Sequence, residues 1–328
     1  MPSSSYDLPG GYLLQDRYSL QSVLGQGGFG ITYLAFDKKL EQEICIKELF
    51  IAGNCTRGAH FTVHSQAGGD FKFKDFIDRF LNEARQLARF QHPNIVRVTD
   101  VFEANETAYM VMEYVKGETL KHRVKSKGAF SEVEGKELIA ELLSAVEEVH
   151  KSGSLHRDIK PDNIIVDARN RLVLIDFGSA REYAEGRTTT QTAMITPGYA
   201  PIEQYSNRAP RGPFTDIYSI GATMYFMFSG NNPIPVTDRH LEELPSLCSL
   251  NAEISKHLSD LVIKSMAIKP ADRYQNIQSL EKMLDKNEDG EIKVGVVSPA
   301  GPSEKGKPKS SKTKVMIVLV ILVGILAG

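Results

Sequence analysis

Hydrophobic and polar residues alternate with a period of two through the first part of the chain, a pattern typical of half-buried β-strands. Three such runs lie at residues 19–24, 31–36 and 43–49, and two more follow at residues 95–102 and 108–114. A glycine-rich turn and a charged turn separate the first three runs. The pattern therefore predicts a small β-sheet in this part of the chain.

Residues 75–90 predict a helix, because their apolar residues recur every three or four positions on one face. Glu83 completes this spacing. A carboxylate within an apolar stripe costs stability unless a cation pairs with it. The apolar face comprises Phe76, Phe80, Leu87 and Phe90.

The stretch between the third strand and this helix, residues 50–70, is irregular and rich in glycine and small polar residues. It contains Cys55, His60 and His64, whose side chains are common metal ligands. Their spacing is irregular, so we favour an exposed, inserted loop over a metal site.

After the last predicted strand the pattern becomes helical. Ser131 and Glu134 form a capping box at the start of a helix that continues to about His150. Strands followed by helices indicate an α+β architecture with a small sheet lobe and a larger helical lobe. Three further helices are predicted at residues 215–228, 254–267 and 277–284.

Charged residues are concentrated in one short stretch, directly before the β-branched apolar run 164–166. A catalytic loop needs such a concentration, because it must place a base, a cation and a metal ligand around one point. Residues 172–178 likewise place an acid beside a strand, because an apolar strand there ends in Asp176. Two acids near the ends of strands are suited to a divalent metal that bridges phosphates. The stretch contains His156, Arg157, Asp158, Lys160, Asp162 and Asn163.

The glycine-rich turn contains Gly25, Gly27 and Gly30. Without side chains, such a turn allows backbone N–H groups to approach phosphates. A dinucleotide-binding fold uses the same spacing, but there a helix follows the glycines, whereas here a strand follows. Lys47 lies among apolar residues, and Glu83 is the carboxylate available to pair with it. The alternative is a lysine that reaches the surface of an edge strand.

Together these residues resemble the signature set of eukaryotic-type serine/threonine protein kinases, of the bacterial membrane-anchored kind. The resemblance extends over residues 18–284. It implies a bilobal kinase fold, with an antiparallel-sheet N-lobe at 18–115 that carries one main helix and a helical C-lobe at 116–284. The matching motifs are the glycine-rich turn, Ile46-Lys47, His156-Arg157-Asp158 with Asn163 five positions later, and Asp176-Phe177-Gly178.

The resemblance implies transfer of the ATP γ-phosphate to serine or threonine hydroxyls of protein substrates, with Mg²⁺, or Mn²⁺ as an alternative. Lys47, held by Glu83, would contact the α- and β-phosphates. Asp158 would orient the substrate hydroxyl and accept its proton, and Lys160 would stabilise the γ-phosphate. The implied metal ligands are Asn163 and Asp176. The other implied ATP-binding residues are Leu24, Gly25, Gly27, Gly30, Thr32, Cys45, Met112, Glu113 and Val115.

Regulatory and structural residues follow from the same resemblance. Arg157 would bind a phosphate on the activation loop, and Thr196 matches the threonine that lines the peptide site. The candidate autophosphorylation sites are Thr188, Thr189, Thr190 and Thr192. Structural roles are implied for His156, Phe177, Gly178, Glu203, Asp216 and Arg273. Among these, Glu203 would pair with Arg273, and Asp216 would brace the catalytic loop.

Several positions depart from the family pattern without removing a catalytic group. Thr32 stands where valine is usual, and Cys45 replaces a smaller alanine in the roof of the adenine pocket, where its thiol could be reactive. The sequence Ala-Pro-Ile-Glu, ending at Glu203, has one residue more than the usual motif. Lys47 and Glu83 are 36 positions apart, which is longer than is common in the family. The insertion, residues 50–74, could dock a partner or hold the helix in an inactive position.

The amino-acid composition limits the cellular compartment and the partners that we expect. Three cysteines without paired spacing, Cys45, Cys55 and Cys248, favour a reducing compartment over disulfides or zinc. A net charge of −2 gives no overall attraction to nucleic acid, and we expect no such partner. The polar N-terminal tail, residues 1–17, does not have the pattern of a signal peptide.

The C-terminal residues differ from the rest. After a lysine-rich linker at 285–314, residues 315–328 form an uncharged apolar run. As a helix it would reach about 21 Å, short of a bilayer core of about 30 Å. We expect the start of a truncated transmembrane helix or an unusual tail anchor, with the kinase domain on the cytoplasmic side because lysines precede it. The alternative is a buried C-terminal strand or helix.

Two other functions compete with an active protein kinase. A pseudokinase scaffold would lack a residue such as Lys47, Asp158, Asn163 or Asp176, and all four are present. A small-molecule phosphotransferase of related fold would lack the peptide-positioning segment that residues 196–201 resemble. The sequence leaves open whether the chain forms a homodimer that phosphorylates itself in trans.

Overall fold

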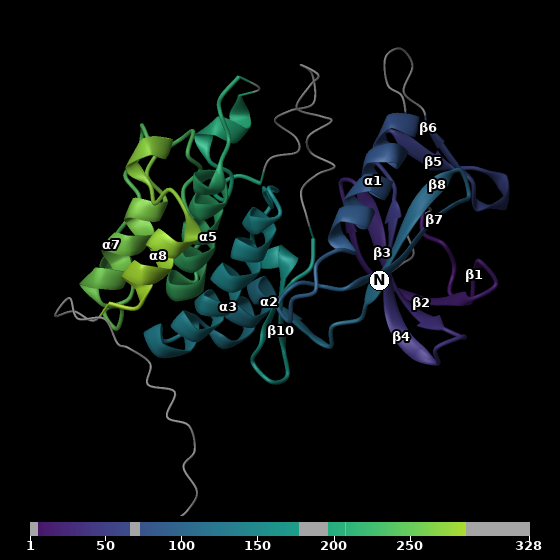
Figure 1. Cartoon of the computed structure of the whole chain (residues 1–328), viewed down its shortest axis with the longest axis horizontal. Helices are drawn as coiled ribbons and strands as arrows, with labels where there is room; N and C mark the ends of the chain where they lie inside the picture. The colour runs from purple at the N-terminus through teal and green to yellow at the C-terminus, as the bar shows by residue number, and fades with distance from the viewer. Residues whose placement is uncertain (1–5, 66–72, 177–195, 207, 287–328) are drawn as a thin grey trace, which may run out of the picture. The chain divides into compact units, whose positions relative to one another are not determined.

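The computed structural model describes residues 6–65, 73–176, 196–206 and 208–286, all within one compact unit. Figure 1 shows a sheet and helix α1 (Phe73–Leu87) in the N-terminal part of the chain, and a group of helices in its C-terminal part. We call these the sheet lobe and the helical lobe. Among the described residues no helix is long and apolar enough to span a membrane. The apolar run 315–328 lies outside them.

The sheet lobe contains a six-stranded antiparallel sheet in the order β1-β2-β3-β4-β8-β7. Its alternating residues explain the strands, because every second side chain of β3 and β4 is buried. The five predicted strands are confirmed in place, with boundaries shifted by a few residues. The strands are β1 (Leu13–Leu14), β2 (Tyr18–Gly27), β3 (Gly30–Asp37), β4 (Gln42–Leu49), β7 (Val98–Ala104) and β8 (Thr107–Glu113).

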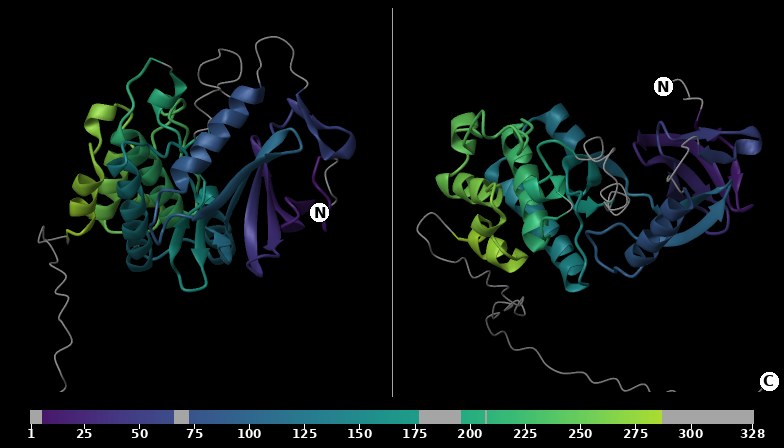
Figure 2. Two further views of the ribbon diagram at one scale, coloured as in Figure 1. Left: turned by 45° about the vertical axis from the view of Figure 1, so that its right-hand side comes forward. Right: turned by 90° about the horizontal axis from the view of Figure 1, so that it is seen from above.

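Helix α1 (Phe73–Leu87) packs against β7 and β8 through the predicted apolar face. Both views in Figure 2 keep this helix beside the sheet. Glu83 is buried on the same helix, with 6% of its surface exposed. The helix ends at Leu87 rather than at residue 90, but Phe90 still packs against the core of the lobe.

The insertion after β4 differs from the prediction. We expected an exposed loop at residues 50–70, and this is wrong for the part that the structure describes. That part forms a hairpin, β5 (Cys55–Arg57) and β6 (Val63–Ser65), around the 3-10 turn η1 (Ala59–Phe61). Small polar residues dominate the composition, but the few apolar ones are placed to join the core. The buried ones are Phe50, Ile51, Cys55 and Val63.

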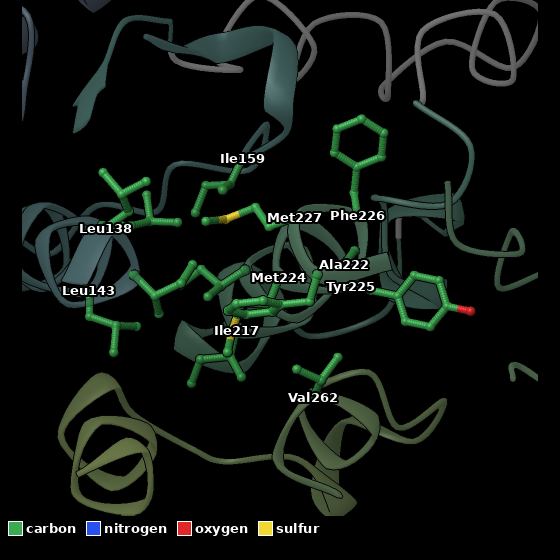
Figure 3. Packing of buried hydrophobic residues seen from close by; sticks show 14 of the residues in the cluster. Leu138, Leu143, Ile159, Ile217, Ala222, Met224, Tyr225, Phe226, Met227 and Val262 are labelled. Carbon is green, nitrogen blue, oxygen red and sulfur yellow. The ribbon is translucent and has the colours of Figure 1, made fainter. Parts of the chain in front are cut away.

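The helical lobe is built around α5 (Pro213–Ser229), which is buried along almost its whole length. Figure 3 shows Ile217 of α5 in one cluster with Leu143 of α3 and Val262 of α7. The other helices are α2 (Leu120–Lys127), α3 (Glu132–Lys151), α6 (Leu247–Leu250), α7 (Lys256–Ser265) and α8 (Ile277–Leu284). The 3-10 turns are η2 (Pro161–Asn163), η3 (Ile202–Tyr205) and η4 (Pro270–Asp272).

A local sequence motif explains where helix α3 begins. At the start of α3, Ser131 accepts a hydrogen bond from the Glu134 N–H, and Glu134 accepts one from the Ser131 N–H, as the capping box predicts. Such a cap contributes about 1 kcal/mol. The sequence pattern is helical after the last predicted strand, where α2 lies, but it did not delimit α2 or α6, which are short.

A small antiparallel sheet connects the helices with the loops of interest. It consists of β9 (Gly117–Thr119), β10 (Ile164–Asp167) and β11 (Leu172–Leu174), with β10 in the centre. Because β10 follows Asn163 directly and β11 ends just before Asp176, the two strands bring both loops to the same end of this sheet.

Candidate active site

A cavity of about 460 Å³ is lined by residues from both lobes. All of the predicted ATP-binding residues except Gly30 line it, as do the two predicted metal ligands. They are Leu24, Gly25, Gly27, Thr32, Cys45, Lys47, Met112, Glu113 and Val115, with Asn163 and Asp176. A larger hollow of about 850 Å³ also adjoins residues 113–115, but none of the predicted catalytic or metal-binding residues lines it. The smaller cavity is therefore the candidate site.

Three apolar residues of this cavity were not predicted from the sequence: Val96, Ile165 and Ile175. Ile165 could have been predicted as a cavity residue, because it lies in the apolar run directly after the charged loop. Side chains of such a strand alternate between its two faces, so one member of the run had to face away from the core of the helical lobe.

The glycine-rich turn joins β2 to β3, and Gly27 pairs with Gly30 across it. Gly30 does not line the cavity, but a Cβ atom built on it would lie 2.6 Å from the Glu48 carbonyl oxygen. Only glycine permits this close approach between the turn and β4. The approach matters for the site because Lys47 lies next to Glu48 on β4.

Lys47 forms an ion pair with Asp176 across the cavity. Burial lowers the pKa of Lys47, but the charges of Asp176 and Glu83 raise it more, so that the pKa stays above its ordinary value. Burial likewise raises the pKa of Asp176, and the charge of Lys47 and the hydrogen bond from it outweigh this effect, so that the pKa of Asp176 is lowered. The cavity therefore holds a charged lysine and a charged carboxylate. The ion pair is formed with Asp176, while Glu83 acts on Lys47 through its charge.

The predicted catalytic loop, residues 154–163, places its charged groups around Asp158, which is 8% exposed. Lys160 Nζ donates to Asp158 Oδ2 at 2.9 Å and to Thr196 Oγ1 at 3.3 Å. Asn163 Nδ2 donates to the same Oδ2 at 2.9 Å and to the Asp158 carbonyl oxygen at 2.9 Å. One carboxylate oxygen thus accepts hydrogen bonds from both Lys160 and Asn163, which fixes the orientation of the Asp158 carboxylate.

The residues fit a magnesium ion. The Asn163 amide nitrogen is used by Asp158, so its amide oxygen is the atom that can bind a cation. Asp176 binds Lys47 through Oδ1, which leaves Oδ2 as a second oxygen ligand. Mg²⁺ is commonly bound by one or two such oxygens together with water and phosphate. Among the described residues, the candidate site included, no group of three or more His, Cys, Asp or Glu residues could hold a metal by itself.

Asp216 of α5 lies under the catalytic loop and is fully buried. Its Oδ2 accepts hydrogen bonds from the His156 N–H at 2.9 Å and from His150 Nε2 at 2.7 Å, and its Oδ1 accepts one from the Arg157 N–H at 2.7 Å. Burial raises the pKa of Asp216, but the hydrogen bond and charge of His150 lower it more, so that its pKa lies below the ordinary value.

Arg157 adopts a left-handed backbone conformation with φ 66°, which is uncommon for a residue other than glycine. Asp216 accepts its N–H, and Gln204 Nε2 donates to its carbonyl oxygen at 2.8 Å. These bonds hold the strained residue next to Asp158. His150 and Gln204 were not predicted from the sequence. No local pattern marks either of them, because both act on residues far away in the chain.

Glu203 and Arg273 form a buried ion pair with two hydrogen bonds, of 2.7 and 3.1 Å. Thr215 at the start of α5 donates to Glu203 as well, at 3.1 Å. Arg273 uses its remaining donors on backbone carbonyl groups, including those of Ala267 and Ile268. The pair therefore ties η3 to α5 and to the segment before α8.

Cys45 lines the cavity roof, where the sequence suggested a reactive thiol. Burial raises the pKa of the Cys45 thiol to about 12, and the nearby charge of Lys47 lowers it by less. Because the thiolate is the reactive form of cysteine, this raised pKa disfavours reaction of Cys45 at neutral pH. Six of the predicted residues lie outside the described residues. They are Phe177 and Gly178 and the candidate phosphorylation sites Thr188, Thr189, Thr190 and Thr192.

Comparisons with known proteins agree with this geometry. The sequence model described as "Protein kinase domain" matches residues 18–286. Serine/threonine-protein kinase PknB of Mycobacterium tuberculosis is 34% identical over 292 residues, which cover 85% of this chain and 44% of PknB. The probable serine/threonine-protein kinase CPE1738 of Clostridium perfringens is 31% identical over 289 residues, 84% of this chain and 39% of the relative. The chain thus spans less than half the length of these curated relatives.

The solved structure "PpkA-294 apo form" has a TM-score of 0.77 and 36% sequence identity, and the match covers 85% of this chain and 100% of that one. The bilobal α+β kinase fold predicted from the sequence is thereby confirmed. Since the family match extends over most of the chain, the protein belongs to the eukaryotic-type serine/threonine protein kinase family.

Proposed function

We propose that the chain is an active, ATP-dependent serine/threonine protein kinase. The observation that supports this most directly is the meeting of Lys47 from β4 with Asn163 and Asp176 in one cavity. Beside it, the Asp158 carboxylate is oriented by Lys160 and Asn163. Phosphoryl transfer depends mainly on positioning and on neutralising phosphate charge, and these groups supply both.

In the proposed reaction, Asp158 orients the substrate hydroxyl and takes its proton as the new bond from that oxygen to the γ-phosphorus forms. The bond from the γ-phosphorus to the oxygen that joins it to the β-phosphate breaks, and ADP leaves. Lys160 contacts the γ-phosphate, and Lys47 contacts the α- and β-phosphates. Asn163 and Asp176 would hold Mg²⁺, or Mn²⁺, which when bound neutralises charge on the phosphate oxygens.

The test uses the purified chain with labelled ATP, Mg²⁺ and a generic protein substrate. Wild type should label the substrate on serine or threonine, and Asp158→Asn should lower this labelling by orders of magnitude while ATP still binds. The chain is instead a pseudokinase if wild type and Asp158→Asn label neither themselves nor the substrate. Phosphorylated tyrosine as the main product would contradict the substrate class.

Regulation through the activation loop is a second part of the proposal. Arg157 would bind a phosphate there, and Thr188, Thr189, Thr190 and Thr192 are the candidate sites. Thr196 lies within hydrogen-bond distance of Lys160, which supports a place beside the peptide substrate. Mass spectrometry of wild type after incubation with ATP should find phosphate on at least one of the four threonines, and its absence there would contradict this part.

We also propose that the protein is anchored in a membrane through residues 315–328, with the kinase domain in the cytoplasm. The lysine-rich residues before this apolar run support that orientation. Removing residues 315–328 should move the protein from the membrane fraction to the soluble fraction. Equal membrane recovery of both forms would refute the anchor. Cross-linking of the full chain would show whether it forms a homodimer.

A further inference from the structure

The sheet lobe contains a buried charged cluster on the face of the sheet opposite the cavity. Glu48 has no exposed surface, and its carboxylate accepts hydrogen bonds from Tyr33 and Tyr109, each at 2.8 Å. Two further bonds come from the Arg57 guanidinium, at 3.0 and 2.8 Å. Arg57 belongs to β5 of the insertion, so the insertion supplies the countercharge for a carboxylate inside the sheet.

The cluster lies directly behind the phosphate-binding lysine. Side chains of a strand alternate between its two faces, and Cys45 and Lys47 line the cavity. Glu48 therefore faces away from the cavity, and Tyr109 lies opposite it on β8. Any bond that fixes Glu48 also fixes the backbone that carries Lys47.

The insertion also contacts the glycine-rich turn. The N–H of Phe50 donates to the Phe29 carbonyl oxygen at 3.2 Å, and the N–H of Ala52 donates to the Gly28 carbonyl oxygen at 3.1 Å. In a trans peptide the N–H points away from the carbonyl group of the same plane. Fixing the Gly28 carbonyl therefore fixes the direction of the Phe29 N–H, one of the backbone donors of the turn.

The segment between these two contacts is itself rigid. A tight turn spans residues 51–54, with the Asn54 N–H bonded to the Ile51 carbonyl oxygen at 3.1 Å and Gly53 at φ 79°. Positive φ at this third position is the signature of a type II turn. Ile51 and Cys55, on either side of the turn, are both buried.

We propose that residues 50–57 form a brace that positions the glycine-rich turn and Lys47 for the phosphates of ATP. Arg57 and Ala52 are positioning residues in this account, because they touch Glu48 and Gly28 rather than the nucleotide. The proposal rests on the proposed function, since it assumes that ATP binds in the cavity. It assigns the insertion a role in nucleotide binding rather than in docking a partner.

The sharpest test is Ala52→Pro. Proline lacks the N–H that bonds to Gly28, but it is favoured at the second position of a type II turn, where Ala52 stands exposed. Ala52→Ser is the matched control, because it keeps the N–H. We expect the Kd for MgATP, measured by calorimetry on the full chain, to rise about fivefold in Ala52→Pro, which corresponds to the loss of a net hydrogen bond of about 1 kcal/mol. Ala52→Ser should bind as wild type does.

A second variant tests the charged cluster. Arg57→Met alone leaves a buried carboxylate without its countercharge and risks unfolding the lobe, so we combine it with Glu48→Gln. The glutamine is uncharged, and its amide oxygen still accepts a hydrogen bond from one of the two tyrosines. Arg17→Met with Asp37→Asn is the control. It removes another doubly hydrogen-bonded pair of the sheet lobe, at the opposite end of β3. The first double variant should weaken MgATP binding by a factor similar to that of Ala52→Pro, and the control should not.

The outcomes separate a brace from a merely structural element. Weaker MgATP binding by Ala52→Pro with an unchanged melting temperature supports the brace, as does a larger change in the KM for ATP than in kcat. Wild-type Kd values in both Ala52→Pro and the Arg57→Met/Glu48→Gln variant would overturn it while leaving the proposed function intact. If wild type itself does not bind MgATP, the proposed function fails, and the brace fails with it.

Discussion

Replacing Asp216 by asparagine tests whether helix α5 sets the geometry of the catalytic loop. The change keeps the shape of the side chain but removes its charge and turns one oxygen into an N–H₂ group. In the structure both oxygens are acceptors, with His150 and His156 on Oδ2 and Arg157 on Oδ1. An asparagine can serve only one of these two sides.

The magnitude follows from the donors that lose their acceptor. If the amide oxygen takes the place of Oδ2, the Arg157 N–H is left without an acceptor. If it takes the place of Oδ1 instead, the donors of His150 and His156 are left without an acceptor. An unsatisfied buried donor costs about 1–3 kcal/mol. Arg157 is also in a strained conformation that costs on the order of 1–3 kcal/mol and persists only while its neighbours hold it. Because relaxation of this strain offsets part of the loss, we expect the free energy of unfolding to fall by about 1–3 kcal/mol.

The effect on catalysis should be separable from the effect on stability. A relaxed Arg157 peptide moves Asp158, and a displacement of about 1 Å at a catalytic group can cost on the order of 100-fold in rate. The KM for ATP should stay within about twofold, because Asp216 does not line the cavity. The assays are urea unfolding followed by circular dichroism, and initial rates of substrate labelling at saturating ATP.

Thr223→Val is the matched control for this prediction. Thr223 is also fully buried on α5, but its hydroxyl donates only to the Ser219 carbonyl oxygen, at 2.8 Å, within the same helix. It should lose some stability and keep its kcat. A folded Asp216→Asn protein with the kcat of wild type would refute the reasoning, and so would an equal loss of kcat in Thr223→Val.

Three further predictions concern pH, packing and reactivity. The pKa of Asp216 in the folded protein lies below its unfolded value of about 3.9. The ionised carboxylate therefore contributes fully to stability above the unfolded pKa, and this contribution is lost as the pH falls through the folded-state pKa. Acid unfolding of Asp216→Asn should for this reason depend less steeply on pH than that of wild type. Gly135→Ala should destabilise the protein by about 1–3 kcal/mol in thermal unfolding, despite its place in α3, because the added Cβ would lie 2.2 Å from the Phe228 ring. Cys45 should resist alkylation by iodoacetamide at pH 7.5 in the folded protein, as read by mass spectrometry, and rapid labelling would contradict its raised thiol pKa.

The parts of the fold that the sequence could predict are those with local causes. The strands and α1 were visible because alternation and the helical period repeat within one element. The cap formed by Ser131 and Glu134 spans only three positions, so it could be read directly from the chain. The candidate residues Asp158, Lys160, Asn163 and Asp176 could be proposed from the sequence because polar and charged residues are concentrated in two short segments, at 156–163 and 172–178.

The parts that could not be predicted depend on contacts between distant segments. Arg57 lies in a stretch whose composition suggests a loop, and only the folded sheet shows that its partner Glu48 is buried. His150 and Gln204 have no local pattern that marks them, because their partners are Asp216 and the Arg157 carbonyl group. The raised thiol pKa of Cys45 likewise arises from burial by the completed cavity roof.

These long-range contacts divide the candidate site into two halves with separate supports. The roof with Lys47 rests on Glu48, a carboxylate buried behind β4, whereas the catalytic loop with Asp158 rests on Asp216, a carboxylate buried in α5. Each carboxylate is surrounded by donors from its own lobe. Changes at the Glu48 cluster should therefore weaken ATP binding, and changes at Asp216 should slow phosphate transfer. Since the two clusters share no residue, their effects on kcat/KM should be additive, within about 0.5 kcal/mol, in a variant that combines Ala52→Pro with Asp216→Asn.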